Sequence, residues 1–350
     1  KFIMYTTIKK SSDYFNTKLY TGTGSNQSLT GVGFQPDLIW WKCRNSAKNH
    51  GLTDAVRGNT KIIRSNEASA ESTDTTYIQS FDSDGTTIGS NGNINSNGDT
   101  FCLWNWKANG AGSANTDGDV TSTVSVNTTP GFSIVKWDST GTAGINIGHG
   151  LGQKPAMIIA KCLNQSSTSW PVYHQSLGAT KYVSLQATTA EATSATRWNN
   201  SEPTTTTFQT GSSGDIGGSD RTMIAYCFAE KQGYSKFGRH DGNGSDNGPF
   251  IYTGFKPAFV IIKSYSTNPW ILLDNKRGSY NVNQSKLYPN DSVVENNDTS
   301  NGIDFLSNGL KIRRNNSEIN ASGTAYIYMA FAENPLVANS GTDGVPATAR

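Results

Sequence analysis

The chain has 350 residues and a formal charge of +2; 35% of its residues are hydrophobic and 16% are charged. Its 14 Phe, 14 Tyr and 8 Trp exclude a disordered chain, and the even spread of Lys and Arg argues against a nucleic-acid or membrane-binding surface. No apolar run approaches the ~18 residues of a membrane helix, and the start KFIMYTTIKKSS lacks the apolar stretch of a signal peptide.

The first predicted strand lies in GFQPDLIWWKC, at 33–43, and its pattern returns in LGQKPAMIIAKC at 151–162 and in GFKPAFVIIKS at 254–264. Each copy carries an apolar run between a proline and a lysine. This pattern is typical of a strand that is covered on both faces and begins next to a proline. The copies lie roughly 100–120 residues apart, beyond the ~20–50-residue periods of solenoid repeats.

Three landmarks follow each of these strands in the same order. A short run that closes on glycine comes first, in HGLTDAVRG (50–58), WPVYHQSLG (170–178) and WILLDNKRG (270–278). A turn motif follows, in FDSDG (81–85), FLSNG (305–309) and, more loosely, FQTG (208–211). An aromatic-rich strand closes each copy, in FCLWNWK (101–107), MIAYCFAE (223–230) and YIYMAFAE (326–333).

These ordered landmarks predict an all-β protein with three related β-sandwich repeats in tandem, of jelly-roll or lectin-like type, joined by long polar loops. The stretch 108–131 is rich in Gly, Ser and Thr, so we expect it to be a linker or a long edge excursion. The predicted parts are an N-terminal arm at 1–13, repeat one at 14–107, the linker at 108–131, repeat two at 132–233, repeat three at 234–333 and an extended C-terminal tail at 334–350.

Two pairs of tryptophans raise the question of a ligand-stacking platform. Trp40 and Trp41 are neighbours in a predicted strand, so they point to opposite faces and cannot share one stacking surface. The matched positions in the other copies are apolar, which favours packing in the core or between domains. Trp104 and Trp106 lie two residues apart, on one face, and we interpret them in the same way.

Two further tryptophans are unique to one copy and lie in polar surroundings. Trp137 occurs in VKWDSTG and Trp198 in RWNNSE. We predict that they are exposed and contact a glycan, with packing at a sheet edge as the alternative.

Candidate catalytic groups have simpler explanations. Asp54 with Arg57, and Asp274 with Arg277, are expected to be turn-stabilising ion pairs. The second copy has His174 in the acid position instead. No G-x-S-x-G nucleophile elbow is present, so no catalytic residue is predicted and the protein is not expected to be an enzyme. The chain has four histidines: His50, His149, His174 and His240.

Neither metal nor cofactor is predicted. Acidic turns at 82–85, 115–119 and 241–248 offer oxygen ligands, but they lack the terminal glutamate of a calcium loop. Turn chemistry therefore explains them, with bound Ca²⁺ as the alternative. The cysteines show no C-x-x-C spacing and lie in apolar runs, so we expect buried free thiols in a chain that folds in a reducing cytoplasm: Cys43, Cys102, Cys162 and Cys227.

Several stretches together carry a resemblance to a known group. They include MYTTIKKSSDYFNTKLYTGTGSNQSLTGVGFQPDLIWWK, FDSDGTTIG, FCLWNWKANG and MAFAENPLVANSGTDGVPATAR. With them, nearly the whole chain resembles the modular virion structural proteins of marine tailed bacteriophages, such as those infecting cyanobacteria and Pelagibacter. The resemblance implies a structural protein of the virion surface, in or near tail fibres or other appendages. No catalytic residues come with it.

Three functions follow as expectations. The first is a non-enzymatic virion structural protein of the tail fibre or appendage type that packs against copies of itself, as a homotrimer, and against other virion proteins. The second is a capsid decoration protein, for which the same composition would serve. The third is a carbohydrate-binding module for host-surface glycan or a glycan-degrading tailspike enzyme, the latter requiring two carboxylates in a groove.

Overall fold

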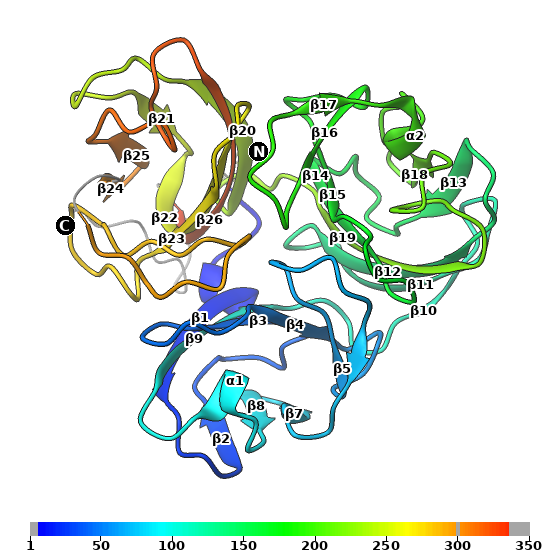
Figure 1. The fold of residues 1–350 in the computed structure, drawn as a ribbon, viewed down its shortest axis with the longest axis horizontal. Helices are drawn as coiled ribbons and strands as arrows, with labels where there is room; N and C mark the ends of the chain where they lie inside the picture. Colours follow the sequence, from blue (N-terminus) through cyan, green and yellow to red (C-terminus); the bar gives the residue numbers. More distant parts are fainter. Residues whose placement is uncertain (1–5, 299–301, 336–350) are drawn as a thin grey trace, which may run out of the picture.

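The computed structural model describes residues 6–298 and 302–335, and its regular secondary structure is almost entirely antiparallel strand, which confirms the all-β prediction. Figure 1 shows the strands gathered into three lobes around a common centre. We call these lobes the first unit (15–106), the second unit (113–228) and the third unit (235–335). Most of the predicted C-terminal tail, residues 336–350, lies outside the described range. Within that range, no helix is long and apolar enough to cross a membrane.

The first unit packs a four-stranded sheet, in the order β1-β9-β3-β4, against a three-stranded sheet, in the order β2-β8-β7. Its strands are β1 (Phe15–Thr21), β2 (Gln27–Thr30), β3 (Leu38–Cys43), β4 (Gly51–Asp54), β7 (Ile78–Asp82), β8 (Gly85–Ile88) and β9 (Thr100–Trp106). The short elements are η1 (Ser11–Asp13), β5 (Lys61–Ile62), β6 (Ser72–Thr73) and α1 (Gly92–Asn95).

The second unit has an eight-stranded sheet, in the order β10-β11-β12-β19-β14-β15-β16-β17, and a two-stranded sheet, β13-β18. Its elements are β10 (Ser113–Asn115), β11 (Ser122–Asn127), β12 (Phe132–Ser139), β13 (Ile145–Gly148), β14 (Met157–Cys162), β15 (Pro171–His174), β16 (Lys181–Ser184), β17 (Ala192–Thr193), α2 (Ala195–Trp198), β18 (Thr207–Thr210) and β19 (Arg221–Phe228).

The stretch 108–131 is an edge excursion of this sheet and not a linker. It contributes β10 and β11, which pair with each other and then with β12. Alternation in TSTVSVN turns Val124 into the core of the second unit, where it is 4% exposed. The composition suggested a linker because most of the stretch 109–121 is exposed, whereas Ser122 and Ser125 of β11 are buried.

The third unit repeats the arrangement of the first, with sheets in the orders β20-β26-β22-β23 and β21-β25-β24. Its strands are β20 (Ser235–Asp241), β21 (Phe250–Tyr252), β22 (Phe255–Ser264), β23 (Trp270–Asp274), β24 (Ile303–Leu306), β25 (Gly309–Ile312) and β26 (Ala325–Pro335).

The larger sheets of the three units share one strand order. The strand with the proline-to-lysine run (β3, β14 or β22) lies between the closing strand (β9, β19 or β26) and the strand that ends at the Asp or His landmark (β4, β15 or β23). The pairing register sets Trp40 opposite Trp104, Ile159 opposite Tyr226 and Ile261 opposite Met329. These registers define equivalent positions in the three units.

A central core joins the units. Each unit has its own core between its two sheets, and a further core collects apolar side chains from the outer faces of all three larger sheets. In its middle Trp106, Phe228 and Phe331, at equivalent positions of the closing strands, contact one another with ring centroids 5.9–6.4 Å apart. The units therefore form a closed ring around shared aromatic packing (Figure 1).

The adjacent tryptophans of β3 serve two different cores. Trp40 lies in the central core, with its ring centroid 6.0 Å from that of Trp104. Trp41 points to the other face, into the core of the first unit, where its ring lies 5.5 Å from Tyr77. Each tryptophan is at most 2% exposed, which confirms core packing. Trp104 and Trp106 both lie in the central core, as their shared face predicts.

Candidate functional site

Both predicted glycan contacts lie inside the core of the second unit. Trp137 is 2% exposed and Trp198 is 1% exposed, and both rings meet Phe208 edge-on at centroid distances of 5.5 and 6.4 Å. The expectation that they are exposed was therefore wrong. Their polar neighbours face solvent instead: Asp138 follows Trp137 on the opposite face of β12, and Trp198 is the one buried residue of α2.

Charged side chains gather where one unit meets the next. At the junction of the first and second units, the Arg57 Nε lies 2.5 Å from the Asp54 Oδ2, and its Nη1 lies 3.0 Å from the Glu71 Oε2. The Tyr226 hydroxyl, from β19 of the second unit, donates to the same Asp54 oxygen at 2.8 Å. The predicted ion pair exists, but it is buried and connects two units. Burial opposes the charge of Arg57 and is the largest single influence, but Asp54, Tyr226 and Glu71 together outweigh it and raise the pKa of the guanidinium.

The junction of the third and first units has the same set of contacts: an Asp–Arg ion pair, a glutamate and a donor from the neighbouring unit. The Arg277 Nε lies 2.6 Å from the Asp274 Oδ2, and the Nη1 lies 3.0 Å from the Glu295 Oε2. Here the Trp104 Nε1, from β9 of the first unit, donates to the Asp274 Oδ2 at 2.9 Å. Trp104 and Tyr226 occupy equivalent positions, so at these two junctions a side-chain donor of the closing strand reaches the carboxylate of the neighbouring unit.

The junction of the second and third units departs from this pattern on both sides. The equivalent closing-strand residue is Met329, which offers no N–H or O–H group, and the facing landmark has His174 and Leu177 in place of Asp and Arg. The His174 Nε2 lies 3.2 Å from the Tyr328 carbonyl oxygen. The buried Asp–Arg pair is thus present at the two junctions where the closing strand of the neighbouring unit provides a donor. It is absent at the junction where that strand has Met329.

His50 and His174 are neutral junction groups. The Trp40 Nε1 donates to the His50 Nδ1 at 2.9 Å, so the Nε2 carries the proton and donates to the Tyr288 carbonyl of the third unit at 2.9 Å. A backbone N–H fixes the same tautomer in His174. Burial lowers the pKa of His174 to about 4 and holds the pKa of His50 well below its usual range.

The lysine that ends each apolar run is fully buried. Lys161 donates to the Thr168 carbonyl at 2.8 Å and to the Ala68 carbonyl of the first unit at 3.3 Å. Lys263 donates to the Ser264 carbonyl at 2.8 Å and to the Thr188 carbonyl of the second unit at 3.4 Å. Burial lowers the pKa of each of the three lysines, Lys42 included, to about 8. Sequence reasoning gave these lysines no role, although a lysine inside a buried run in all three copies was visible.

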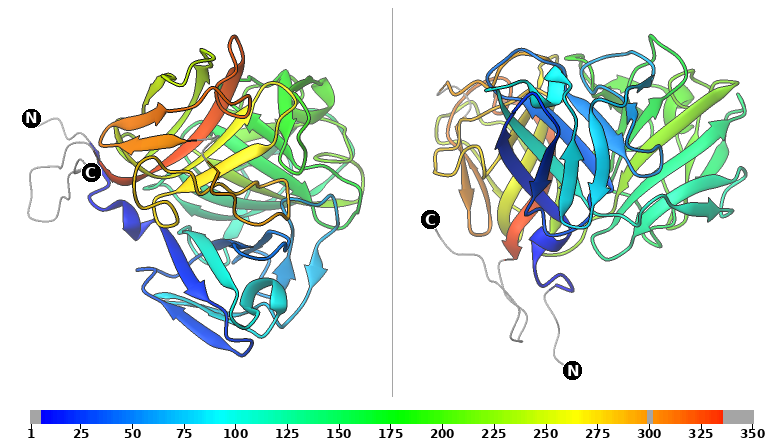
Figure 2. Two further views of the ribbon diagram at one scale, coloured as in Figure 1. Left: turned by 60° about the vertical axis from the view of Figure 1, so that its left-hand side comes forward. Right: turned by 90° about the horizontal axis from the view of Figure 1, so that it is seen from below.

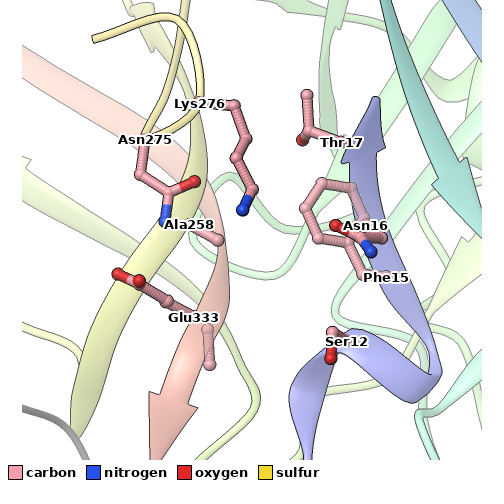
Figure 3. Close-up of a pocket in the computed structure, with 9 residues that line it drawn as sticks. Ser12, Phe15, Asn16, Thr17, Ala258, Asn275, Lys276 and Glu333 are labelled. Atoms are coloured by element: carbon pink, nitrogen blue, oxygen red, sulfur yellow. The ribbon is translucent and has the colours of Figure 1, made fainter. Parts of the chain in front are cut away.

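Two hollows accompany these junctions. One is a polar groove between the first and second units, lined by Lys61 and Glu71 from one side and Lys136 and Thr222 from the other. The other, which we call the junction pocket, lies between the third and first units and is shown in Figure 3. Its polar lining includes Thr17, Asn275 and Lys276. Neither hollow is lined by a tryptophan, so exposed tryptophans could not have indicated either of them in the sequence.

A family model described as a domain of unknown function (DUF7483) matches residues 10–335. The chain belongs to the DUF7483 family. The match runs through all three units of the ring. No curated protein and no solved structure matches the chain.

The acidic loops of this DUF7483 domain bind backbone groups. Asp84 accepts hydrogen bonds from the backbone N–H groups of Gly31 and Gly33 at 2.9 and 2.7 Å, and the Asp119 carboxylate accepts one from Asn146 at 2.8 Å. Over residues 6–298 and 302–335, no three His, Cys, Asp or Glu side chains converge as a metal site would require. All four cysteines are buried free thiols, as predicted, and burial raises the pKa of Cys102 and Cys227.

Proposed function

We propose that this DUF7483 protein is a non-enzymatic structural component of a tailed-phage virion, placed in a tail fibre or another surface appendage. The proposal combines the sequence resemblance to modular virion proteins with one structural observation, the closed ring. Three units share one core, and the ring is sealed by buried ion pairs, neutral histidines and buried lysines. Acid, cationic and imidazole groups of the kind that enzymes use are held here in contacts between units.

The ring is well suited to a structural part of a particle. Its junction contacts are buried and therefore little screened by salt, and a buried charge that loses its partner is strongly destabilising. Long polar loops cover the outside, while the apolar faces of the larger sheets meet inside. Such a ring can present its loops without exposing sheet faces that invite aggregation.

A capsid decoration protein is the second candidate, and a specific observation favours it. One chain already closes its own three-unit ring, so the central core needs no second copy. The helix η1 and the end of β26 lie together on one side of the ring (Figure 2). The expected homotrimer would have to use the outer surfaces of the units.

Imaging of phage particles tests the proposal and separates the two candidates. An antibody raised against the purified chain is applied to particles from an infected culture, and bound gold is located by electron microscopy. Label on fibres or tail appendages supports the proposal, and label distributed over the capsid supports decoration. Absence of the protein from purified particles by mass spectrometry, with the protein present in the lysate, would overturn both.

A further inference from the structure

The junction pocket differs from the equivalent places at the other two junctions. Equivalence follows from one backbone bond that recurs in each unit: Asn275 N–H to the Ala258 carbonyl, Gln175 N–H to the Ala156 carbonyl, and Ala55 N–H to the Asp37 carbonyl. Asn275, Gln175 and Ala55 therefore occupy one structural position. By strand register, Thr17 of the facing strand is equivalent to Ile134 and Phe237.

The other two junctions are closed at this position. Between the second and third units, the Gln175 Nε2 donates to the Phe237 carbonyl at 2.6 Å. Between the first and second units, the pair consists of Ala55 and Ile134, which are apolar, and the adjacent Val56 packs against the central core. The Gln175 hydrogen bond closes the second–third junction, and apolar residues occupy the equivalent positions at the first–second junction.

The third–first junction leaves a buried hydroxyl group without a partner. The Thr17 hydroxyl oxygen is buried and has no hydrogen-bond partner in the described part of the chain, and Thr17 as a whole is 8% exposed. Asn275, which also lines the pocket, is 6% exposed. Figure 3 shows both side chains at the pocket, on opposite walls. Buried polar groups are normally satisfied, so the Thr17 hydroxyl calls for a ligand or water.

The pocket also carries a surplus positive charge. Figure 3 shows the Lys276 ammonium reaching into the space between Asn275 and Phe15. The carboxylate of the lining, Glu333, is already neutralised by the buried Lys256 at 3.1 Å. Among the described residues, no other Asp or Glu lines the pocket. An anionic group on the ligand would therefore be attracted to Lys276.

Size and shape narrow the class of ligand. The pocket holds about 50 Å³, a few times the space that one water molecule requires, and it opens to solvent. Phe15 and Ala258 supply an apolar surface beside the polar groups. A hollow of this size accepts one edge of a sugar ring, with a carboxylate and neighbouring hydroxyl groups, and leaves the rest of a glycan outside.

We propose that the junction pocket binds a carboxylate-bearing saccharide residue of the uronic-acid class. Lys276 pairs with the carboxylate, while Asn275 and Thr17 hydrogen-bond to ring hydroxyl groups. This inference rests on the proposed function in one respect: host-surface glycan is the source of the residue. It replaces Trp137 and Trp198 as the glycan contact.

Isothermal titration of the full chain with the methyl glycosides of glucuronic acid and glucose tests the inference. We expect the glucuronide to bind and the glucoside, which lacks the carboxylate, to bind about tenfold more weakly. Lys276→Met is expected to weaken glucuronide binding about tenfold. The matched control is Lys136→Met, which removes a half-buried lysine from the polar groove of the first–second junction and is expected to leave binding unchanged.

A second variant separates binding from folding. Thr17→Val replaces the unpartnered hydroxyl by a methyl group, so it is expected to raise the melting temperature of the free protein while weakening glucuronide binding. The inference is overturned if wild type binds neither glycoside at 10 mM ligand, or if both pocket variants bind as wild type does. Particle imaging does not enter this test, so a virion role and a saccharide site can fail separately.

Discussion

At the scale of single residues, the most informative feature is a buried carboxylate that serves two neighbours. Asp274 pairs with Arg277 in its own unit and accepts the Trp104 N–H of another. Both members of the ion pair are 0% exposed. Breaking such a pair leaves an uncompensated buried charge, which costs far more than the loss of a surface pair.

We therefore expect Asp274→Asn to lower the free energy of unfolding by about 3–5 kcal/mol. Asparagine keeps the side-chain shape, but its NH2 group cannot accept the N–H donors that meet one of the two Asp274 oxygens, so the loss combines the charge with hydrogen bonds. Urea denaturation followed by tryptophan fluorescence measures it. The control is Asp13→Asn, whose partner Lys10 lies 3.4 Å away with both side chains at least 50% exposed, and this change should be nearly silent. A loss of less than about 1 kcal/mol for Asp274→Asn would contradict a charge-dependent junction.

The buried histidines predict how stability depends on pH. Burial lowers the pKa of His149 and His174 to about 4, whereas an unfolded histidine titrates near ~6.5. Below pH 6.5 these histidines bind protons in the unfolded chain but stay neutral in the folded chain. Their contribution to stability is therefore complete above pH 6.5 and is lost as the pH falls toward 4. Each histidine should cost about 1.3 kcal/mol between pH 7.5 and 5.5.

Urea titrations at these two pH values measure the loss. In His174→Gln, the amide can donate to the Tyr328 carbonyl but does not titrate. The loss of unfolding free energy between pH 7.5 and 5.5 should therefore be smaller in this variant by the contribution of one histidine, about 1.3 kcal/mol. An unchanged difference would show that His174 does not contribute to the acid sensitivity.

At the scale of elements, side-chain volume is matched across the paired strands β3 and β4. Trp41 lies opposite Gly51, and a Cβ atom built on Gly51 would lie 2.0 Å from the Trp41 Cζ2. The equivalent pair in the third unit is Ile262 opposite Ile271. In the first unit a large indole ring faces a glycine, which has no side chain, and in the third unit two isoleucines of medium size face each other. Both combinations fill the same space.

Gly51→Ala should therefore destabilise the chain by about 1–3 kcal/mol, because the new methyl group overlaps the indole. Trp41→Ile combined with Gly51→Ile, which copies the third unit, should be less destabilising than the sum of its single changes. A thermodynamic double-mutant cycle in urea measures this coupling. Additive effects would mean that the two positions are not packed against each other.

Sequence reasoning located these strands but not their faces. Alternation within DLIWWK separates Trp40 from Trp41, and the apolar matches in the other copies indicate packing. It does not tell which face meets a neighbouring unit, because both faces of the strand are apolar. The donors Tyr226 and Trp104 reach the Asp-x-x-Arg landmarks because of the strand register and the closure of the ring. Local sequence patterns predict neither of these. Trp137 was misjudged because its polar flanks lie on the opposite face of its strand.

At the scale of the whole molecule, the ring should unfold as one body. The central core takes side chains from all three larger sheets, so each unit alone would expose the apolar face that it contributes to that core. We expect a single calorimetric transition for the full chain, with equal calorimetric and van't Hoff enthalpies. Separate transitions would indicate units that are stable independently.

The same shared core predicts the behaviour of a unit expressed alone. In residues 14–107, Trp40, Trp104 and Trp106 would lose their cover and lie on an exposed sheet face, and Asp54 would lose Tyr226. Burying this surface accounts for much of the stability available to so short a chain. We expect a narrow, unfolded amide spectrum by NMR for this fragment and a well-dispersed spectrum for the full chain. A dispersed spectrum from the fragment would mean that the two facing sheets of one unit suffice to fold and that the ring is an assembly of independent parts.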